Sequence, residues 1–160
     1  MASPPEPHDI RLRKHLDGTI PAAAWPDGYS MRPFAADDAA GLHALLTSVF
    51  DDGSDGPFET WWPRLQGDPQ FDPALCFLVF APDGVLAAAA LCWTTGFIKD
   101  LAVRPEARRR GLGRALMLHA FGVFQQRGAA HCDLKTNLVS NAEAVVLYER
   151  LGMVQVDWEG

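Results

Sequence analysis

The chain has 160 residues, of which 48% are hydrophobic and 21% are charged, and these values are typical of one globular domain. Its formal net charge of −6 argues against nucleic acid as the main partner, because phosphate binding needs a net basic face. No apolar run approaches the roughly 18 residues that a membrane span requires. We therefore expect neither a nucleic-acid partner nor a membrane partner.

The first 28 residues precede the region with clear secondary-structure signals. Residues 1–8 contain three prolines and lack the apolar core of a secretion signal, so we expect them to be disordered. Residues 9–28 are charged at first and then rich in alanine and proline, and the sequence assigns no element to them. Trp25 is expected to pack on the domain, because an exposed Trp is unfavourable. We predict an N-terminal extension over residues 1–28, partly disordered, and one domain over residues 29–160.

The first half of that domain alternates between strand and helix signals. Leu42, Leu45 and Val49 recur at helical spacing after an acidic helix start. A Pro-Asp-Gly turn at residues 82–84 separates two apolar runs, as in a hairpin. Pro63 is expected to cut or kink a short second helix. The expected strands are residues 29–34, 76–81, 85–93 and 97–103, and the expected helices are residues 37–50 and a short segment around 58–63.

The second half predicts a long helix that is apolar on most of its sides and is therefore buried. Gly128 and Gly152 are typical helix ends. The expected helices are residues 111–127 and 141–151, and the expected strands are residues 130–136 and 153–158. Together the two halves predict an α/β fold in which a mixed sheet carries helices on its faces.

The segment between residues 103 and 115 is the most informative part of the sequence. A strand ends at Val103, and a long helix begins at Gly111 and Gly113. The first N–H groups of a helix have no internal acceptor and lie at the positive end of the helix dipole, which makes them an anion site. Glycines let a phosphate approach the backbone closely. Cationic side chains that suit phosphate oxygens accompany them, namely Arg108, Arg109, Arg110 and Arg114.

Two other interpretations of this segment stay open on its residues alone. A dinucleotide-binding fingerprint needs a small residue at its third position, where this chain has Leu116, and its strand should end directly at the first glycine. The segment could also be an ordinary helix start with two incidental glycines and a solvated arginine run. The lysine-containing loop of ATP-binding proteins is absent from the sequence.

Two motifs together resemble the GCN5-related N-acetyltransferase (GNAT) family. The first is Leu101-Ala102-Val103-x-Pro105 followed by Arg108-x-x-Gly111-x-Gly113. The second is Asn141-x-x-Ala144-x-x-Leu147-Tyr148-x-x-x-Gly152-Met153, in which Met153 stands where the family usually has Phe. The resemblance covers about residues 29–156. It implies a central, mostly antiparallel sheet that is splayed between its fourth and fifth strands, with helices on both faces.

The resemblance also implies a function and a set of site residues. The implied function is acetyl-CoA-dependent transfer of an acetyl group to a primary amine, of a small molecule or of a peptide, by direct attack on the thioester. Tyr148 would donate a proton to the thioester sulfur. The implied acetyl-CoA-binding residues are Leu101, Ala102, Val103, Arg108, Arg109, Arg110, Gly111, Leu112, Gly113, Arg114, Asn141 and Tyr148. The alternative is a non-catalytic acyl-CoA sensor or interaction module with the same fold.

The general base and the amine acceptor are less well defined. Asp100 is a candidate base, and Asp133, Lys135 or a water chain are others. In this fold the acceptor usually meets the first helices and their loop, where acids and aromatics could hold a cationic amine. The candidate acceptor residues are Asp51, Asp52, Trp61 and Trp62. A solvated acidic loop over a tryptophan-anchored core is the other interpretation.

Cysteines and histidines give no sign of a metal site. Cys76, Cys92 and Cys132 form no CxxC pair and lie among apolar residues, which favours buried thiols in a reducing compartment. The five histidines show no metal-ligand spacing relative to these cysteines. We therefore expect a cytoplasmic enzyme without a metal, and a homodimer is one possible assembly.

Overall fold

Seven strands form one sheet in the computed structural model, which describes residues 8–50 and 53–158. Their spatial order is β2-β3-β4-β5-β6-β1-β7. Every neighbouring pair is antiparallel except β5 and β6, which are parallel. The predicted mixed, mostly antiparallel sheet is thereby confirmed. The strands are β1 (Asp9–His15), β2 (Ser30–Pro33), β3 (Phe71–Phe80), β4 (Leu86–Trp93), β5 (Phe97–Val103), β6 (His131–Asn137) and β7 (Val154–Val156).

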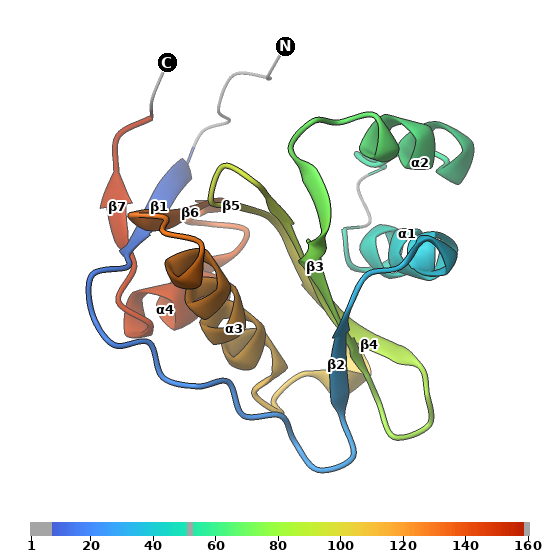
Figure 1. Cartoon of the computed structure of the whole chain (residues 1–160), viewed down its shortest axis with the longest axis horizontal. Coiled ribbons are helices and arrows are strands. Elements are labelled where there is room, and N and C mark those ends of the chain that lie inside the picture. Colours follow the sequence, from blue (N-terminus) through green and yellow to red (C-terminus); the bar gives the residue numbers. More distant parts are fainter. Residues whose placement is uncertain (1–7, 51–52, 159–160) are drawn as a thin grey trace.

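Helices cover both faces of this sheet (Figure 1). Two of them, α1 and α2, lie on one side of strands β3 to β5, and the other two, α3 and α4, lie on the opposite side. The helices are α1 (Ala39–Val49), α2 (Phe58–Gln66), α3 (Leu112–Gln126) and α4 (Ala142–Arg150), with short 3-10 turns at Ala36–Asp38 and Pro105–Ala107. None of the helices in the described residues combines the length and hydrophobicity needed to cross a bilayer.

Strand β1 was not predicted from the sequence. It lies between β6 and β7, five places from β2 in the order of the sheet. Ile10 and Leu12 are buried under α3 and α4, whereas Arg11 and Arg13 point to the other face. Because every second residue is charged, the short apolar alternation is easily taken for a polar segment. The predicted boundary at residue 28 stays a prediction, although β1 lies before it.

The segment between β1 and β2 packs along α3 (Figure 1). The Gln125 amide donates hydrogen bonds to the carbonyl oxygens of Leu16 and Gly18, at 3.0 and 2.6 Å. The Trp25 ring lies 6.2 Å from the His119 ring and packs against the core cluster under α3. The expectation that Trp25 packs on the domain is confirmed. The expected disorder of residues 1–8 falls outside the described residues, apart from His8.

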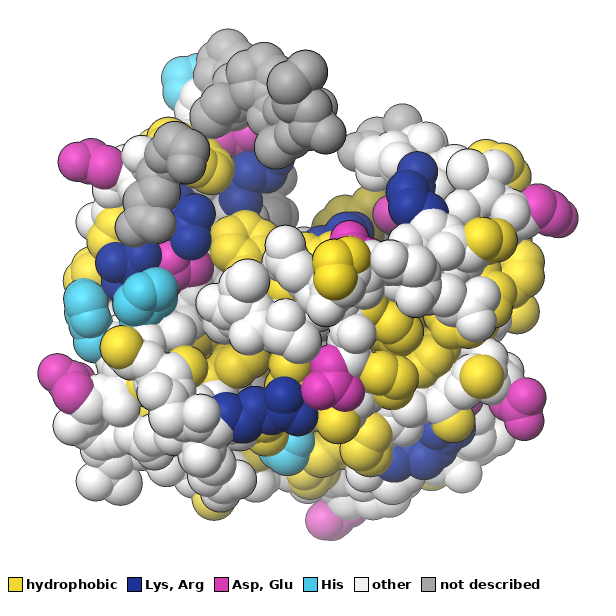
Figure 2. Space-filling model, turned by 45° about the horizontal axis from the view of Figure 1, so that its top comes forward, with side chains coloured by type: hydrophobic (Ala, Val, Ile, Leu, Met, Phe, Trp, Pro, Cys, Tyr) yellow, Lys and Arg dark blue, Asp and Glu magenta, His cyan; other side chains and the backbone are white. Residues whose placement is uncertain are grey.

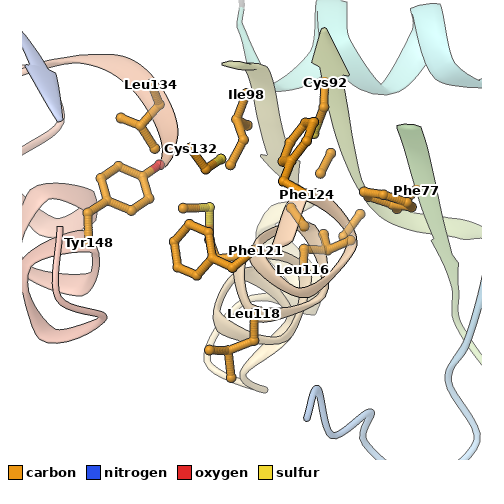
Figure 3. Packing of buried hydrophobic residues seen from close by; sticks show 14 of the residues in the cluster. Phe77, Cys92, Ile98, Leu116, Leu118, Phe121, Phe124, Cys132, Leu134 and Tyr148 are labelled. Atoms are coloured by element: carbon orange, nitrogen blue, oxygen red, sulfur yellow. The ribbon is translucent and has the colours of Figure 1, made fainter. Parts of the chain in front are cut away.

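The core consists of two apolar clusters separated by the sheet. The larger one lies between the sheet and α3, where Leu116, Phe121 and Phe124 pack toward Phe77 and Ile98 (Figure 3). The smaller one lies between the sheet and helices α1 and α2. Because alternate residues of each strand face opposite clusters, the strands join both into one unit.

Two element boundaries differ from those predicted by more than two residues. Helix α2 continues past Pro63 to Gln66, and the Gly67 N–H donates to the Pro63 carbonyl oxygen at 3.0 Å. Pro63 removes one helical bond, to the carbonyl of the exposed Glu59, and water can satisfy that carbonyl. Strand β3 starts at Phe71 rather than at Cys76, with an irregular register between these two residues.

Candidate acetyl-CoA site

The parallel strands β5 and β6 pair only at their first residues. Phe97 lies opposite Asp133 and Ile98 lies opposite Leu134, and in the described part of the chain no further residues of these strands pair. Strand β5 continues to Val103 and β6 continues to Asn137. The second half of β5 therefore has β4 on one side and an open edge on the other.

A bulge at Lys99 decides which backbone groups face that open edge. Cys92 pairs with Ile98 and Leu91 pairs with Asp100, so Lys99 is an extra residue in β5. The Arg104 N–H donates to the carbonyl oxygen of Ala87, near the start of β4, at 2.9 Å. In an antiparallel ladder a residue directs its N–H and C=O to the same neighbour, and the direction alternates along the strand.

It follows that the backbone of Ala102, two residues before Arg104, also faces β4. Leu101 and Val103 must then direct their N–H and C=O groups to the open edge. The Arg108 Nε donates to the Val103 carbonyl oxygen at 3.1 Å, which agrees with this direction. A ligand lying along β5 can thus form strand-like hydrogen bonds with Leu101 and Val103.

The turn between β5 and α3 presents backbone amides at the end of this edge. Gly111 stands directly before α3 with φ +81°, a left-handed conformation that favours glycine. Arg109 also has a positive φ, of 64°. Among the described residues no side chain caps the first turn of α3, so the N–H groups of residues 112–114 point to the space before the helix. Positions of this kind bind phosphate oxygens.

A cavity of about 410 Å³ joins the open edge of β5 to this turn. It is formed by β5, by the turn and the start of α3, by α4 and by the end of α1. Its lining residues are Val49, Phe50, Leu101, Val103, Ala107, Arg108, Arg109, Gly111, Leu112, Gly113, Arg114, Asn141, Glu143, Ala144, Leu147 and Tyr148. The two sequence motifs, which are about 30 residues apart in the chain, therefore meet in one cavity.

Tyr148 lies in α4 with its side chain turned toward the sheet. The residue is buried, and burial raises the pKa of its hydroxyl to about 12. Figure 3 shows the ring beside Leu134, with its oxygen directed away from α4 toward Cys132. The hydroxyl is therefore protonated at neutral pH and lies beside the strand β6 that parts from β5, so it can donate a hydrogen bond there.

Asn141 stands at the start of α4 and lines the same cavity. Its amide nitrogen donates to the Thr136 hydroxyl oxygen at 3.3 Å. Thr136 is a buried residue of β6, so the bond ties the start of α4 to that strand. The amide oxygen of Asn141 is then the group with which it can accept a hydrogen bond from a ligand.

Two predicted acetyl-CoA-binding residues lie outside the cavity lining. Ala102 is fully buried and faces the cluster under α1, because it alternates with Leu101 and Val103. Arg110 lines a second hollow, of about 550 Å³, next to the β3–β4 hairpin and the segment before β2. The other ten predicted residues line the cavity.

The candidate bases occupy different environments. Asp100 faces the α1 side of the sheet, where its carboxylate lies 2.8 Å from the Lys99 ammonium. Asp133 is buried and receives hydrogen bonds from Arg11 at 2.7 Å and from Arg13 at 2.9 Å. Burial alone would raise the pKa of Asp133, but these hydrogen bonds outweigh it and lower the pKa. Asp133 thus serves as the anchor of strand β1, and Lys135 lies 3.6 Å from Asp9.

The candidate acceptor residues Trp61 and Trp62 do not line this cavity. Trp61 is buried in the cluster under α1, and the Trp62 ring packs on Phe34 at 5.6 Å. Asp51 and Asp52 lie outside the described residues. Sequence reasoning missed Val49 as a lining residue, because its helical spacing marks it only as a core position of α1.

Comparison with known proteins identifies the family of the chain. The sequence profile of the acetyltransferase (GNAT) family matches residues 40–153. Streptothricin acetyltransferase from Streptomyces lavendulae is 31% identical, over 91% of this chain and 77% of that protein. A mycothiol acetyltransferase from Thermobispora bispora is 32% identical, over 91% of this chain and 53% of that protein. The crystal structure of a GCN5-related N-acetyltransferase from Sphaerobacter thermophilus matches with a TM-score of 0.81 and 28% identity, over 92% of this chain and 48% of that one.

The fold and these relatives identify an N-acetyltransferase, and the chain belongs to the acetyltransferase (GNAT) family. It spans about half the length of the mycothiol acetyltransferase that it matches. Across the described residues, no cluster of three or more His, Cys, Asp or Glu side chains could hold a metal ion.

Proposed function

We propose that this chain transfers the acetyl group of acetyl-CoA to a primary amine by direct attack on the thioester. The observation that carries the proposal is the single cavity in which the open edge of β5, the uncapped start of α3 and Tyr148 meet. Acetyl-CoA supplies an electrophilic acyl carbon and a thiol leaving group. The residues of the cavity fit such a ligand, because amides, arginines and an apolar wall follow one another in the order that its diphosphate, its pantetheine arm and its acyl group require.

The turn before α3 would hold the diphosphate. The N–H groups from Arg109 to Arg114 lie at the positive end of the helix dipole, and the arginine side chains add charge. Leu101 and Val103 would pair with the pantetheine arm as an added strand pairs with a sheet edge. Asn141 would accept a hydrogen bond from the same arm through its amide oxygen.

The catalytic step would use three groups of this chain. An outward-directed N–H of β5, near Val103, donates to the carbonyl oxygen, on which negative charge develops. The Tyr148 hydroxyl donates to the departing sulfur. Asp100, on the side of the sheet opposite Tyr148, would accept the proton of the amine. Asp100→Asn should then lower the turnover number at neutral pH, and unchanged turnover would remove Asp100 from this role.

The direct test of the function is a thiol-release assay with acetyl-CoA and a panel of amines. The panel contains polyamines, amino acids, aminoglycosides, streptothricin and peptides. Streptothricin has priority, because a protein named streptothricin acetyltransferase is 31% identical to this chain. Release of thiol that depends on one amine class supports the proposal, whereas no release above the rate with water across the panel contradicts it.

The acceptor would enter from the α1 side. Figure 2 shows the molecule hollowed between the part that carries α1 and α2 and the part that carries β1, β6 and β7. Phe50, at the end of α1, reaches the cavity from this side. The predicted roles of Asp51, Asp52, Trp61 and Trp62 in holding the amine stay part of the proposal.

We also propose a homodimer formed through the surface of α4 and β7. Five large hydrophobic residues between positions 138 and 158 are at least 39% exposed, namely Leu138, Val139, Val146, Val154 and Trp158. A groove of about 250 Å³ among α4, β1 and β7 lies in the same region. A second copy is the occupant we favour, because similar chains are about twice as long and thus have room for a second unit of this size.

The dimer is tested by the mass in solution of Val146→Glu. Val85 is the matched control, because both valines are 47% exposed and Val85 lies in the β3–β4 hairpin. Light scattering should show a dimer for the unchanged chain and for Val85→Glu, and a monomer for Val146→Glu. A monomer in all three cases would refute the dimer.

For the location we propose the cytoplasm, because Cys76, Cys92 and Cys132 are buried free thiols.

A further inference from the structure

The cavity beside β5 reaches both faces of the sheet. Leu101 and Val103 pack against the core cluster under α3, on one face. Val49 and Phe50 pack against the cluster under α1, on the other face. All four residues line the same cavity. Since the sheet separates the two clusters, the cavity must pass beside the open edge of β5 from one face to the other.

The last turn of α1 lines one part of this cavity. The Phe50 N–H donates to the Leu46 carbonyl oxygen at 2.8 Å, which fixes the end of the helix. Phe50 and Val49 are both half-buried and apolar. They are the lining residues that α1 and its end contribute in the described part of the chain, and neither can form a side-chain hydrogen bond. This apolar wall suits an alkyl group.

The order of groups along the cavity indicates which part of a ligand meets this wall. The start of α3 marks one end, where phosphate oxygens fit. Leu101 lies further along β5 from this turn than Val103, and Tyr148 lines the same cavity. If the thioester sulfur lies at the Tyr148 hydroxyl, the acyl chain is the next part of the ligand and extends toward Phe50.

We infer that Phe50, flanked by Val49, is the residue that limits the length of the acyl chain which this site accepts. The inference rests on the proposed acetyl-CoA site and adds a specificity determinant to it. A longer acyl chain would have to displace the aromatic ring, and a packed wall typically discriminates about 10- to 200-fold per methylene group. Truncating Phe50 opens the end of the cavity and should remove this discrimination.

The test is calorimetric titration of CoA, acetyl-CoA, propionyl-CoA and butyryl-CoA, which needs no amine acceptor. The variant is Phe50→Ala, and the matched control is Phe58→Ala. Phe58 is also half-buried and packs against the same cluster under α1, but it does not line the cavity. Phe50→Leu, a smaller change, serves if Phe50→Ala fails to fold in a thermal melt.

We expect the unchanged chain and Phe58→Ala to bind acetyl-CoA more tightly than butyryl-CoA. In Phe50→Ala the ratio of the two dissociation constants should shift toward butyryl-CoA by about tenfold or more. An unchanged ratio in the folded Phe50 variants overturns the inference, and so does an equal shift in Phe58→Ala. If the unchanged chain binds none of the four ligands, the proposed acetyl-CoA site itself fails.

Discussion

Replacing Tyr148 by Phe removes one hydroxyl and leaves the buried ring in place. Because burial raises the pKa of Tyr148 to about 12, the hydroxyl lies about 3.5 pKa units above an ordinary thiol, whose pKa is about 8.5. Complete proton transfer to a thiolate would then cost about 5 kcal/mol. Tyr148 should therefore act mainly by donating a hydrogen bond as negative charge develops on the sulfur.

A hydrogen bond to a charged group contributes about 1.5–3 kcal/mol, which corresponds to about 10- to 150-fold in rate. Tyr148→Phe should lower the turnover number by this factor with the Michaelis constant for acetyl-CoA nearly unchanged. Tyr29→Phe is the control, because Tyr29 is the other tyrosine of the chain and lines the second hollow. Steady-state thiol release with both variants gives the comparison.

The pH profile gives an independent check of the same group. A raised pKa keeps the hydroxyl protonated, so the unchanged enzyme should lose this donor only as the pH rises through about 12. A fall in activity near pH 8 to 9 that disappears in Tyr148→Phe would contradict the assignment. Turnover in Tyr148→Phe equal to that of the unchanged enzyme would refute the role of the hydroxyl altogether.

Two further predictions concern the turn and the buried carboxylate. Gly111→Ala places an alanine in a left-handed conformation, which costs about 1–2 kcal/mol of conformational free energy, and should weaken acetyl-CoA binding in calorimetry. Gly122→Ala, within α3, is the control and should leave binding unchanged. Equal binding by both variants would contradict the role of the turn. Asp133→Ala leaves Arg11 and Arg13 without their carboxylate and should lower the free energy of unfolding by about 3 kcal/mol at pH 7 in urea titrations. Because the pKa of Asp133 is depressed in the folded state, its contribution to the free energy of unfolding is complete above about pH 4 and is lost as the pH falls through the folded-state pKa. The stabilities of the variant and the unchanged chain should therefore converge in acid. A constant difference in stability down to pH 2 would contradict this.

Most helices and strands could be predicted from local sequence signals, because these elements depend mainly on residues that are neighbours in the chain. The spacing of Leu42, Leu45 and Val49 gave α1, and the Pro-Asp-Gly turn gave the β3–β4 hairpin. Strand β1 was missed because its partners, β6 and β7, lie more than 110 residues away. Its charged positions also look exposed until Asp133 of β6 is placed beside Arg11 and Arg13.

The cavity, too, could be predicted only in part from the sequence. Motif residues such as Gly111, Asn141 and Tyr148 could be predicted to lie together, because the resemblance fixes their arrangement. The contribution of Phe50 could not, because it depends on how α1 crosses the sheet. The outward direction of Leu101 and Val103 depends on the bulge at Lys99, and a one-residue bulge leaves no clear signal in an alternating strand.

The central claim is that the backbone amides at the start of α3 bind the diphosphate of acetyl-CoA. It is tested most directly by titrating the ¹⁵N-labelled chain with acetyl-CoA and following the amide resonances by NMR. The account predicts saturable shifts that are largest for residues 109–114, with smaller ones at Leu101 and Val103. Saturable binding that leaves the amides of residues 109–114 unshifted, or no binding at millimolar ligand, would contradict it.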